Sequence, residues 1–351
     1  MRGAIWTGDR LVVADDLVVR PPGPGEVRVR VLSSGICHSD LNRMVPAPAR
    51  TPVVLGHEAA GIVAELGTGV GGLALGQPVM VCSQTPCGRC RECRRGAPAN
   101  CAETWGFQPA QPFTWRGRPV FSYANISSFA EEIVVRHDQV FPTGGLPSGE
   151  AALIGCAVAT GWGAIHHLAQ VQSGDRVAVI GVGGIGVNAI RAARLHGAER
   201  ILAIDINARK ADAARQSGAD RFIAADGADL PSLLAAEAPI DAVIECSGAL
   251  AAITLSFDLV KRGGRVVLVG LARPGARLDL DLGRVLLGSS LLSTYQGGTA
   301  PADFPGLIDL VRCKEIDVAS QISQVWPLAE IEAAIAALRA GEVTRAVLDL
   351  A

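Results

Sequence analysis

The sequence predicts an α/β protein with two domains, and three observations support this prediction. Its 351 residues are enough to form two domains with sizeable hydrophobic cores. A β-rich first third is followed, after residue 150, by strands and helices that alternate along the chain. The 41 glycines and the low aromatic content of 4% suit close packing of helices on a sheet.

Composition also excludes several classes of protein. The net charge of −2 gives no basic surface of the kind that binds nucleic acid. The N-terminus lacks the apolar core of a signal peptide, and we find no run of about 18 uncharged apolar residues for a membrane span. Most of the nine cysteines fall in metal-ligand patterns, which fits a reducing compartment. We therefore expect a soluble cytoplasmic protein without a nucleic-acid or membrane partner.

The first third of the chain contains strand patterns. Residues 26–31 alternate charged residues with valine, which is the period of a half-buried strand, and they follow a turn cluster at 21–25. Residues 59–66 and 129–135 are further strand candidates. Residues 102–123 are rich in proline and aromatic side chains, and we expect them to be a loop that shapes a cleft.

Two shorter clusters lie in this β-rich region. The segment 35–40 reads GICHSD, where a strand ends in a loop, and the segment 56–58 reads GHE. An isolated cysteine or histidine is more often a core or surface residue than a ligand. Two such clusters in one β-rich unit favour a metal site, but their spacing alone does not show whether they converge.

Four cysteines then follow within fifteen residues, with the spacing C-x2-C-x2-C-x7-C. The short gaps let neighbouring cysteines reach one ion, and the longer gap lets the chain return to complete a tetrahedron. Four sulfur ligands leave no open coordination position, so a zinc ion here is structural. Two disulfides are disfavoured because the chain has no secretion signal and its other cysteines occur singly. The ligands are Cys87, Cys90, Cys93 and Cys101.

Beyond residue 150 the chain carries the pattern of a dinucleotide-binding unit. An apolar strand at 176–180 runs into GVGGIG at 181–186 and then into a helix at 187–196. A second strand, 200–204, ends at Asp205, which lies 19 positions after the last glycine of the motif. A strand before the motif, a helix after it and an acidic residue at this distance favour dinucleotide binding over an ordinary tight turn.

Each glycine of this motif has a physical role. Gly181 makes the tight turn, Gly183 lets the backbone approach a pyrophosphate, and Gly186 lets the helix pack closely. The N-terminus of the helix faces the anion. Asp205 can accept hydrogen bonds from both ribose hydroxyls but would repel a 2′-phosphate, so NAD is favoured over NADP.

The remaining elements complete the pattern. Residues 241–246 and 265–270 read as further parallel strands of the same sheet. Residues 302–313 and 328–338 are predicted helices, and 344–350 is a predicted strand. We expect this C-terminal portion to fold back onto the first domain.

Six motifs occur in a fixed order along essentially the whole chain. They are GICHSD at 35–40, GHE at 56–58, the cysteine segment at 87–101, LIGCAVATGWGA at 153–164, GVGGIG at 181–186 and DINARK at 205–210. Together they resemble the zinc-dependent alcohol dehydrogenases of the medium-chain dehydrogenase/reductase superfamily. No single motif is decisive, but the complete set with compatible spacing is specific.

The resemblance implies a subunit of two domains. A GroES-like, β-rich catalytic domain comprises residues 1–155 and 295–351 and includes the structural zinc lobe at 87–101. A Rossmann doubly wound NAD-binding domain, residues 156–294, is inserted between these parts, with the active site in the cleft. Relatives pair through the edge strand of the coenzyme sheet, so residues 290–295 are the candidate contact of a homodimer or homotetramer.

The resemblance also implies that the GICHSD and GHE clusters converge on one metal ion, which their spacing alone does not show. Cys37, His57 and Cys156 match the ligands of a catalytic zinc whose fourth position is open to water or substrate. Glu58 would lie beside the ion or ligate it transiently, and Asp40 would orient His57. Each chain would therefore hold two zinc ions, one catalytic and one structural.

Other positions match the family's catalytic and coenzyme contacts. Ser39 matches the first member of a proton relay, and the adjacent His38 and Arg345 match family positions that face the coenzyme pyrophosphate. The implied NAD contacts are His38, Thr160, Gly181, Gly183, Gly184, Ile185, Gly186, Asp205, Lys210, Leu271 and Arg345.

Two positions depart from the family pattern. Asn42 stands where well-known animal members end the relay in a histidine, and an amide cannot shuttle a proton as imidazole does. Ser83 stands where a bulky aromatic side chain often lines the pocket near zinc, which predicts more room unless Trp115, Phe121 and Tyr123 fill it. Ser83 and Tyr123 are thus the candidate pocket residues. Neither departure removes a zinc ligand.

The leading hypothesis is a zinc-dependent oxidoreductase that interconverts alcohols and aldehydes with NAD by hydride transfer. Its expected small-molecule substrates are primary alcohols, bulky or aromatic ones among them. A second hypothesis is oxidation of the adduct between formaldehyde and a low-molecular-weight thiol. A third is a non-catalytic NAD-sensing protein, against which the intact Cys37, His57, Cys156 and Ser39 argue.

The other cysteines and histidines have no predicted role in a site. The three remaining cysteines are expected to be buried thiols. Two of the remaining histidines, His166 and His167, are expected to be packing or surface residues, and the other two lie in no chemical context. These residues are Cys82, Cys246, Cys313, His137, His166, His167 and His196.

Overall fold

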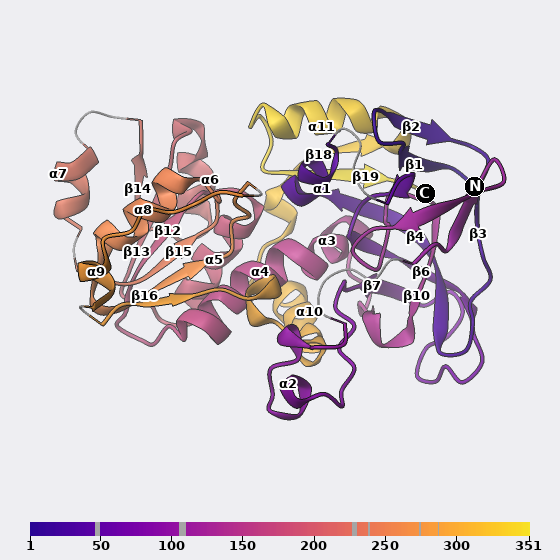
Figure 1. The fold of residues 1–351 in the computed structure, drawn as a ribbon, viewed down its shortest axis with the longest axis horizontal. Coiled ribbons are helices and arrows are strands. Elements are labelled where there is room, and N and C mark those ends of the chain that lie inside the picture. The colour runs from indigo at the N-terminus through magenta and orange to yellow at the C-terminus, as the bar shows by residue number, and fades with distance from the viewer. Residues whose placement is uncertain (46–49, 105–109, 227–229, 238, 274, 287) are drawn as a thin grey trace. The chain divides into compact units, whose positions relative to one another are not determined.

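The computed structural model describes residues 1–351 except 46–49, 105–109, 227–229, 238, 274 and 287. The described residues form two compact units (Figure 1). The first unit comprises Met1–Cys156 and Ala300–Ala351, and the second comprises Ala157–Thr299.

The first unit is built on two sheets. Its described strands are β1 (Gly3–Trp6), β2 (Leu11–Ala14), β3 (Leu17–Val19), β4 (Glu26–Ile36), β5 (Val53–Val54), β6 (Glu58–Leu66), β7 (Pro78–Val81), β8 (Phe113–Trp115), β9 (Arg118–Ser122), β10 (Glu132–Arg136), β11 (Val140–Pro142), β18 (Ile322–Pro327) and β19 (Arg345–Asp349). One sheet has the order β2-β1-β5-β9-β8-β3, and the other has the order β11-β7-β6-β4-β19-β18, with β10 also paired to β4.

Strand β4 is central to the second of these sheets. Its valines at 27, 29 and 31 are fully buried, as the alternating pattern predicts, and they belong to the main core of the unit. Antiparallel β6 lies along one edge of β4, and antiparallel β19 pairs with its last residues. The C-terminal strand therefore lies beside the point where β4 ends at Ile36.

The described helices of the first unit are short. They are α1 (His38–Arg43), α2 (Arg91–Arg94), α3 (Ser148–Leu153), α10 (Phe304–Arg312) and α11 (Ile331–Arg339). Helix α10 ends next to Cys313, whose side chain is exposed, so the prediction of a buried thiol at this position is wrong. Cys82 is buried and Cys246 is partly buried.

The stretch 102–123 is not simply a loop. It contains β8 and β9, which form an antiparallel hairpin, and β8 also pairs with β3 while β9 pairs with β5. The prediction of a loop is therefore wrong for these residues. Residues 105–109 of the stretch lie outside the described residues.

The second unit contains the predicted parallel sheet. Its described strands are β12 (Arg176–Ile180), β13 (Arg200–Asp205), β14 (Arg221–Ala224), β15 (Ile240–Glu245), β16 (Val260–Leu268) and β17 (Ser290–Leu292), in the order β14-β13-β12-β15-β16-β17. Every neighbouring pair in this order is parallel. The chain order reverses between β12 and β15, which makes their carboxyl ends the switch point where doubly wound sheets bind ligands.

Helices flank this sheet. They are α4 (Ala159–Gly163), α5 (Gly184–Leu195), α6 (Ala211–Gln216), α7 (Leu230–Ala235), α8 (Leu250–Leu259) and α9 (Leu282–Leu286). The predicted helix after the glycine-rich motif is α5, which begins three residues earlier than its pattern indicated.

One continuous helix, Ser148–Ala169, comprises α3, a π-helical turn at Ile154–Val158, α4 and a second π-helical turn at Ala164–Ala169. By length and composition alone it is apolar enough to cross a membrane. In the structure 78% of its most apolar window is buried inside the protein, as in a core helix. A side chain at Gly161 would lie 2.7 Å from the Ile185 carbonyl oxygen, so glycine permits the helix to pack closely on α5.

Candidate functional site

The four clustered cysteines converge. Their Sγ atoms all lie within 4.8 Å of one another, and the Cys87–Cys93 and Cys90–Cys101 sulfur pairs are each 4.0 Å apart. A tetrahedral zinc with bonds of 2.3 Å separates its sulfur ligands by about 3.8 Å. Disulfide sulfurs lie about 2.05 Å apart, and all four thiols are free. The lobe therefore has the geometry of a metal site and not of two disulfides.

Backbone amides of the lobe favour thiolate sulfur. The Cys87 amide donates to Cys101 Sγ at 3.3 Å, and the Cys90 amide donates to Cys87 Sγ at 3.3 Å. Burial alone would raise the pKa of Cys101, but hydrogen bonds from Thr104 and from the Cys87 backbone lower it to about 6. A thiolate is the form that binds metal, so at least this ligand is ready at neutral pH.

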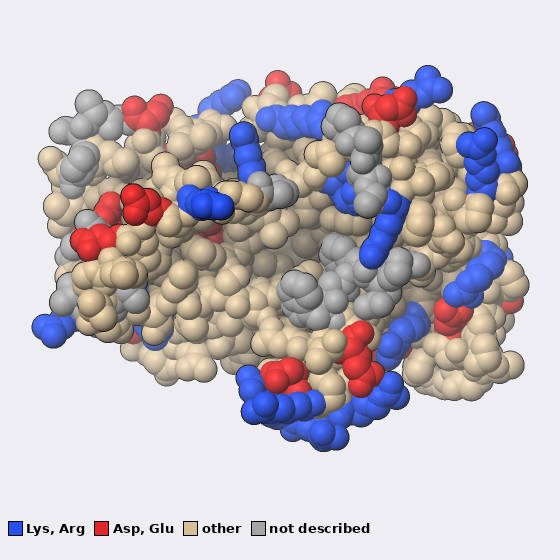
Figure 2. Space-filling model, viewed as in Figure 1, with Lys and Arg blue, Asp and Glu red and all other residues tan. Residues whose placement is uncertain are grey.

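The surface of the lobe is basic. Figure 2 shows Lys and Arg side chains gathered there, with acidic side chains between them. The exposed residues are Arg89, Arg91, Arg94 and Arg95. Arg89 pairs with Glu103 and Arg95 pairs with Glu92, so part of this charge is neutralised on the lobe itself.

A second cluster lies in the core of the first unit. One ligand atom from each of Cys37, His57, Glu58 and Cys156 lies within 4.8 Å of the others. Cys37 caps helix α1 just after β4, and Glu58 begins β6, where it pairs with Gly35. Cys156 comes from the π-helical turn of the long helix. Two antiparallel strands and one helix thus bring together residues that are far apart in the sequence.

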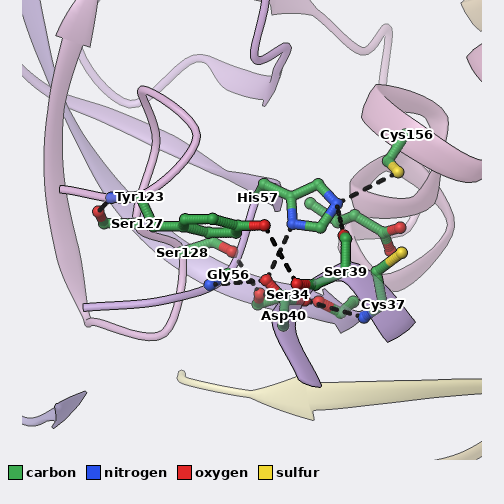
Figure 3. Close-up of polar contacts among 12 residues, drawn as sticks. Ser34, Cys37, Ser39, Asp40, Gly56, His57, Tyr123, Ser127, Ser128 and Cys156 are labelled. Atoms are coloured by element: carbon green, nitrogen blue, oxygen red, sulfur yellow. Dashed lines mark hydrogen bonds and ion pairs between the residues drawn. The ribbon is translucent and has the colours of Figure 1, made fainter. Parts of the chain in front are cut away.

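His57 is oriented by Asp40. Figure 3 shows the imidazole between the Asp40 carboxylate and the Cys156 sulfur. Nδ1 of His57 donates to Asp40 Oδ1 at 2.9 Å, which leaves Nε2 facing Cys156 Sγ at 3.3 Å. Asp40 also accepts hydrogen bonds from the backbone amides of Cys37 and Gly56, at 2.9 and 3.1 Å. A fully buried carboxylate thereby fixes the ring and both chain segments beside it.

Replacement of Asp40 by asparagine is expected to weaken metal binding at this cluster by about 10- to 100-fold, because the amide loses the charge that orients His57. Zinc affinity measured by competition with a chromophoric chelator would test this, with the zinc of the cysteine lobe as an internal reference. Asp138→Asn, on the exposed carboxylate that pairs with Arg136, is the matched control. Equal zinc affinities in Asp40→Asn and Asp138→Asn would show that Asp40 does not position the ligand.

The protonation of this cluster depends on its own contacts. Burial would lower the pKa of His57, but Asp40 raises it well above its usual value. The interaction with Cys156, helped by the charge of His57, lowers the pKa of Cys37 well below that of an ordinary thiol. A metal that binds here therefore displaces a proton from His57 and meets a thiolate at Cys37.

Two hydroxyl groups lie beside the cluster. Ser39 Oγ is 3.3 Å from His57 Nε2, and Tyr123 Oη donates to the Ser39 carbonyl oxygen at 3.2 Å. The Tyr123 and His57 rings pack edge to face, with their centroids 5.8 Å apart. Tyr123, predicted as a pocket residue, thus contacts both a ligand candidate and the relay candidate. Ser83 is buried, and its carbonyl accepts a hydrogen bond from Asn125.

Glu58 forms a buried ion pair with Arg345, which begins β19. Glu58 is fully buried and Arg345 is 4% exposed. Burial raises the pKa of Glu58 and Arg345 opposes that rise. Among the groups that the structure describes, none hydrogen-bonds to Glu58 Oε1, which leaves this oxygen available to a metal. The role of Arg345 at a coenzyme pyrophosphate stays a prediction.

Sequence reasoning missed this ion pair, because its partners are 287 residues apart and no local pattern connects them. It also missed Gly35, where a Cβ atom would lie 1.9 Å from Glu58 Oε2. A glycine inside a strand often marks such a close approach, so Gly35 was a usable signal.

In the second unit, the glycine-rich motif follows β12 and leads into α5. Gly181 has φ = +92°, and a Cβ atom at Gly186 would lie 1.9 Å from the Gly181 carbonyl oxygen. Around Gly183, which precedes α5, no described heavy atom would lie within 4 Å of a Cβ atom. Gly181 thus makes the turn, Gly186 permits the close packing of the helix, and Gly183 leaves the backbone open to approach, which are the roles that the motif gives to these glycines.

Asp205 lies at the end of β13 beside this turn. Its carboxylate accepts hydrogen bonds from the Val182 amide at 2.6 Å and the Asn207 amide at 2.8 Å. Of the other predicted coenzyme contacts in this unit, Thr160 is buried, Ile185 and Lys210 are partly buried, and Leu271 is exposed. Burial lowers the pKa of Lys210 against the attraction of Asp205. His38, in the first unit, is exposed on α1.

Comparison with known proteins identifies the family. An alcohol dehydrogenase GroES-like domain matches residues 23–147, and a zinc-binding dehydrogenase domain matches residues 184–312. Alcohol dehydrogenase-like 6 of Arabidopsis thaliana is 32% identical, over 98% of this chain and 94% of its own length. The chain belongs to the zinc-dependent alcohol dehydrogenases of the medium-chain dehydrogenase/reductase superfamily.

Two further alcohol dehydrogenase relatives differ in the substrates that their names state. S-(hydroxymethyl)glutathione dehydrogenase of Escherichia coli is 33% identical, over 95% of each chain. The crystal structure of benzyl alcohol dehydrogenase from Acinetobacter calcoaceticus matches with a TM-score of 0.90 and 27% identity, over 100% of this chain and 99% of that one. The family is thus clear, and an alcohol dehydrogenase fold with a GroES-like and a coenzyme-binding part is confirmed, while the substrates named for these relatives differ.

Proposed function

We propose that this chain is a NAD-dependent dehydrogenase that interconverts primary alcohols, aromatic or bulky ones among them, with their aldehydes. The observation that supports it most directly is the convergence of Cys37, His57 and Cys156 in one buried cluster, with the Ser39 hydroxyl beside it. Two thiols and one imidazole form the open Cys2His set for which alcohol dehydrogenase is the standard example.

The chain's residues suit two zinc ions and one NAD. Cys37, His57 and Cys156 would hold a catalytic zinc, and the four cysteines of the lobe would hold a structural one. When bound, zinc supplies Lewis-acid polarisation of the substrate oxygen and NAD accepts the hydride. Asp40 keeps the His57 ring in its ligating orientation, and the ion pair with Arg345 neutralises Glu58 beside the site.

Proton removal from the alcohol is assigned to Ser39. Its hydroxyl can accept the substrate proton while it passes on its own, as in a relay. Asn42, on the same short helix, is exposed and cannot accept the proton as an imidazole does. We infer that the proton passes from Ser39 to water.

The preference for NAD is assigned to Asp205. A carboxylate offers about four acceptor positions, and two of those of Asp205 are used by the backbone amides of Val182 and Asn207. The rest remain for ribose hydroxyls, and the negative charge disfavours a 2′-phosphate.

Replacement of Asp205 by serine is expected to raise the KM for NAD by about 10- to 100-fold, because the ribose hydroxyls lose their hydrogen bonds to a charged carboxylate. The ratio of kcat/KM for NADP to that for NAD is expected to rise as well. Steady-state kinetics with both coenzymes would test this, with Asp212→Ser, at an exposed side chain of α6, as the control. An unchanged coenzyme ratio in Asp205→Ser would contradict the assignment.

A substrate panel tests the proposed function. NADH formation would be measured on zinc-loaded protein with primary, secondary, aliphatic and aromatic alcohols, and in a separate arm with formaldehyde plus candidate thiols. Turnover of plain primary alcohols would support the proposal. Activity confined to the thiol arm would favour thiol-adduct oxidation, for which the Escherichia coli relative is the specific reason. No turnover in any arm, despite bound zinc and NAD, would contradict the proposal and favour a non-catalytic NAD-sensing protein.

We also propose a homodimer or homotetramer in the cytoplasm. Strand β17 lies at the edge of the parallel sheet, and Leu291 on it is 49% exposed, which suits pairing with a second copy. All nine cysteines are free thiols, which suits a reducing compartment.

A further inference from the structure

Two histidines that the sequence left without a role meet in the second unit. His166 lies in the final π-helical turn of the long helix, and His196 follows directly after α5. Nδ1 of His166 is 2.9 Å from Nε2 of His196. The His166 ring also stacks on Trp162, with centroids 4.2 Å apart and planes inclined by 21°. The pair is thus held by contacts on both helices, and His166 is exposed.

The tautomer of His196 follows from a second contact. Its Nδ1 is 2.8 Å from the carbonyl oxygen of Ala192. A carbonyl oxygen can only accept, so this nitrogen carries the proton and, in the neutral ring, Nε2 presents its lone pair to His166. A ring N–H donated to a backbone carbonyl is the arrangement that orients histidines which bind metals.

The distance between the two nitrogens fits one shared ion. Nitrogen ligands at 2.1 Å in adjacent positions of a square-planar or octahedral ion lie about 3.0 Å apart. We propose that His166 Nδ1 and His196 Nε2 chelate one divalent transition-metal ion of the nickel, copper or zinc class. Without metal, His166 Nδ1 donates to His196. On binding, that proton moves to His166 Nε2 or to water, and both nitrogens give lone pairs to the ion.

The surroundings define what kind of site this is. Within the described part of the chain, the groups of three or more metal-binding side chains are the two cysteine-containing clusters, so a third protein ligand does not join this pair. Water would fill the other positions, and the ion would exchange readily. It would connect the C-terminal end of α5 to the helix that carries Cys156, and so link two elements on which the proposed active site depends.

Nickel tests the proposal, because it does not oxidise thiols as copper does. Zinc-loaded protein would be titrated with Ni²⁺ by calorimetry, with zinc content measured before and after. The expected result is one additional Ni²⁺ per chain and quenching of the Trp162 share of the fluorescence. That share is identified as the signal lost in Trp162→Phe.

His196→Gln and His166→Gln are expected to abolish this additional Ni²⁺ ion. His137→Gln is the control, because His137 is exposed in the first unit, where its Nδ1 donates a hydrogen bond to the Gly25 carbonyl oxygen. An additional Ni²⁺ ion retained by His196→Gln, or one lost in His137→Gln instead, would overturn the proposal. The same holds if zinc-loaded protein takes up no additional ion at all.

Discussion

Replacement of Cys156 by alanine is expected to remove one of two zinc ions and to lower alcohol turnover by at least about 1,000-fold. The change takes one of three protein ligands from a buried site, and a metal ion contributes several kcal/mol of transition-state stabilisation. Metal content by mass spectrometry and the rate of NADH formation would both be measured. The four-cysteine lobe shares no ligand with this site, so its zinc should remain and report a folded protein.

Cys246→Ala is the matched control, because Cys246 is a free thiol outside both clusters. It is expected to retain two zinc ions and its turnover. A Cys156→Ala protein that keeps both ions and full activity would show that the cluster is not the catalytic site. Loss of both ions would point to unfolding, and His57→Gln would then be used, since it removes a ligand with little change in volume.

Replacement of Arg345 by leucine is expected to lower the free energy of unfolding by about 3–5 kcal/mol, the effect of breaking a buried ion pair. The change leaves the carboxylate of Glu58, which is fully buried, without its partner. Denaturant unfolding followed by tryptophan fluorescence would measure it, and Trp326 on β18, the neighbour of β19, is a suitable reporter. The exposed Arg312, paired with Asp309, gives the control Arg312→Leu, expected to change stability by less than about 0.5 kcal/mol.

A double variant separates charge from packing. Glu58→Gln combined with Arg345→Leu removes both charges and is expected to recover most of the lost stability, because no uncompensated charge then remains buried. Equal instability in the single and double variants would show that Arg345 acts through its packing. A single variant as stable as the parent would show that solvent reaches Glu58.

The sequence was most informative where the chemistry is local. The lobe of Cys87, Cys90, Cys93 and Cys101 could be predicted because its ligands lie within fifteen residues and spacing alone limits their geometry. The glycine-rich motif and Asp205 could be predicted because a strand, a turn and a helix follow one another directly. In both cases the chain itself fixes the relative positions of the residues.

Long-range contacts could not be predicted in the same way. The approach of Cys37 to Cys156 depends on the pairing of β4 with β6 and on a helix that begins more than 100 residues later, and only the family resemblance suggested it. The Glu58–Arg345 pair and the His166–His196 pair left no pattern, because tertiary packing alone brings their partners together. The β8–β9 hairpin was mistaken for a loop because its strands are short and derive their identity from pairing with β3 and β5.

The position of β19 also has a consequence for biosynthesis. Val347 pairs with Gly35, so the ribosome must translate the whole of Ala157–Thr299 before β4 meets this neighbour. The parallel-sheet unit is continuous in sequence and can fold during translation, whereas the unit that holds the Cys37 cluster waits for β19. Until Arg345 arrives, Glu58 lacks its ion-pair partner in the nascent chain. The cluster is therefore completed late, after the nucleotide-binding half has had time to form.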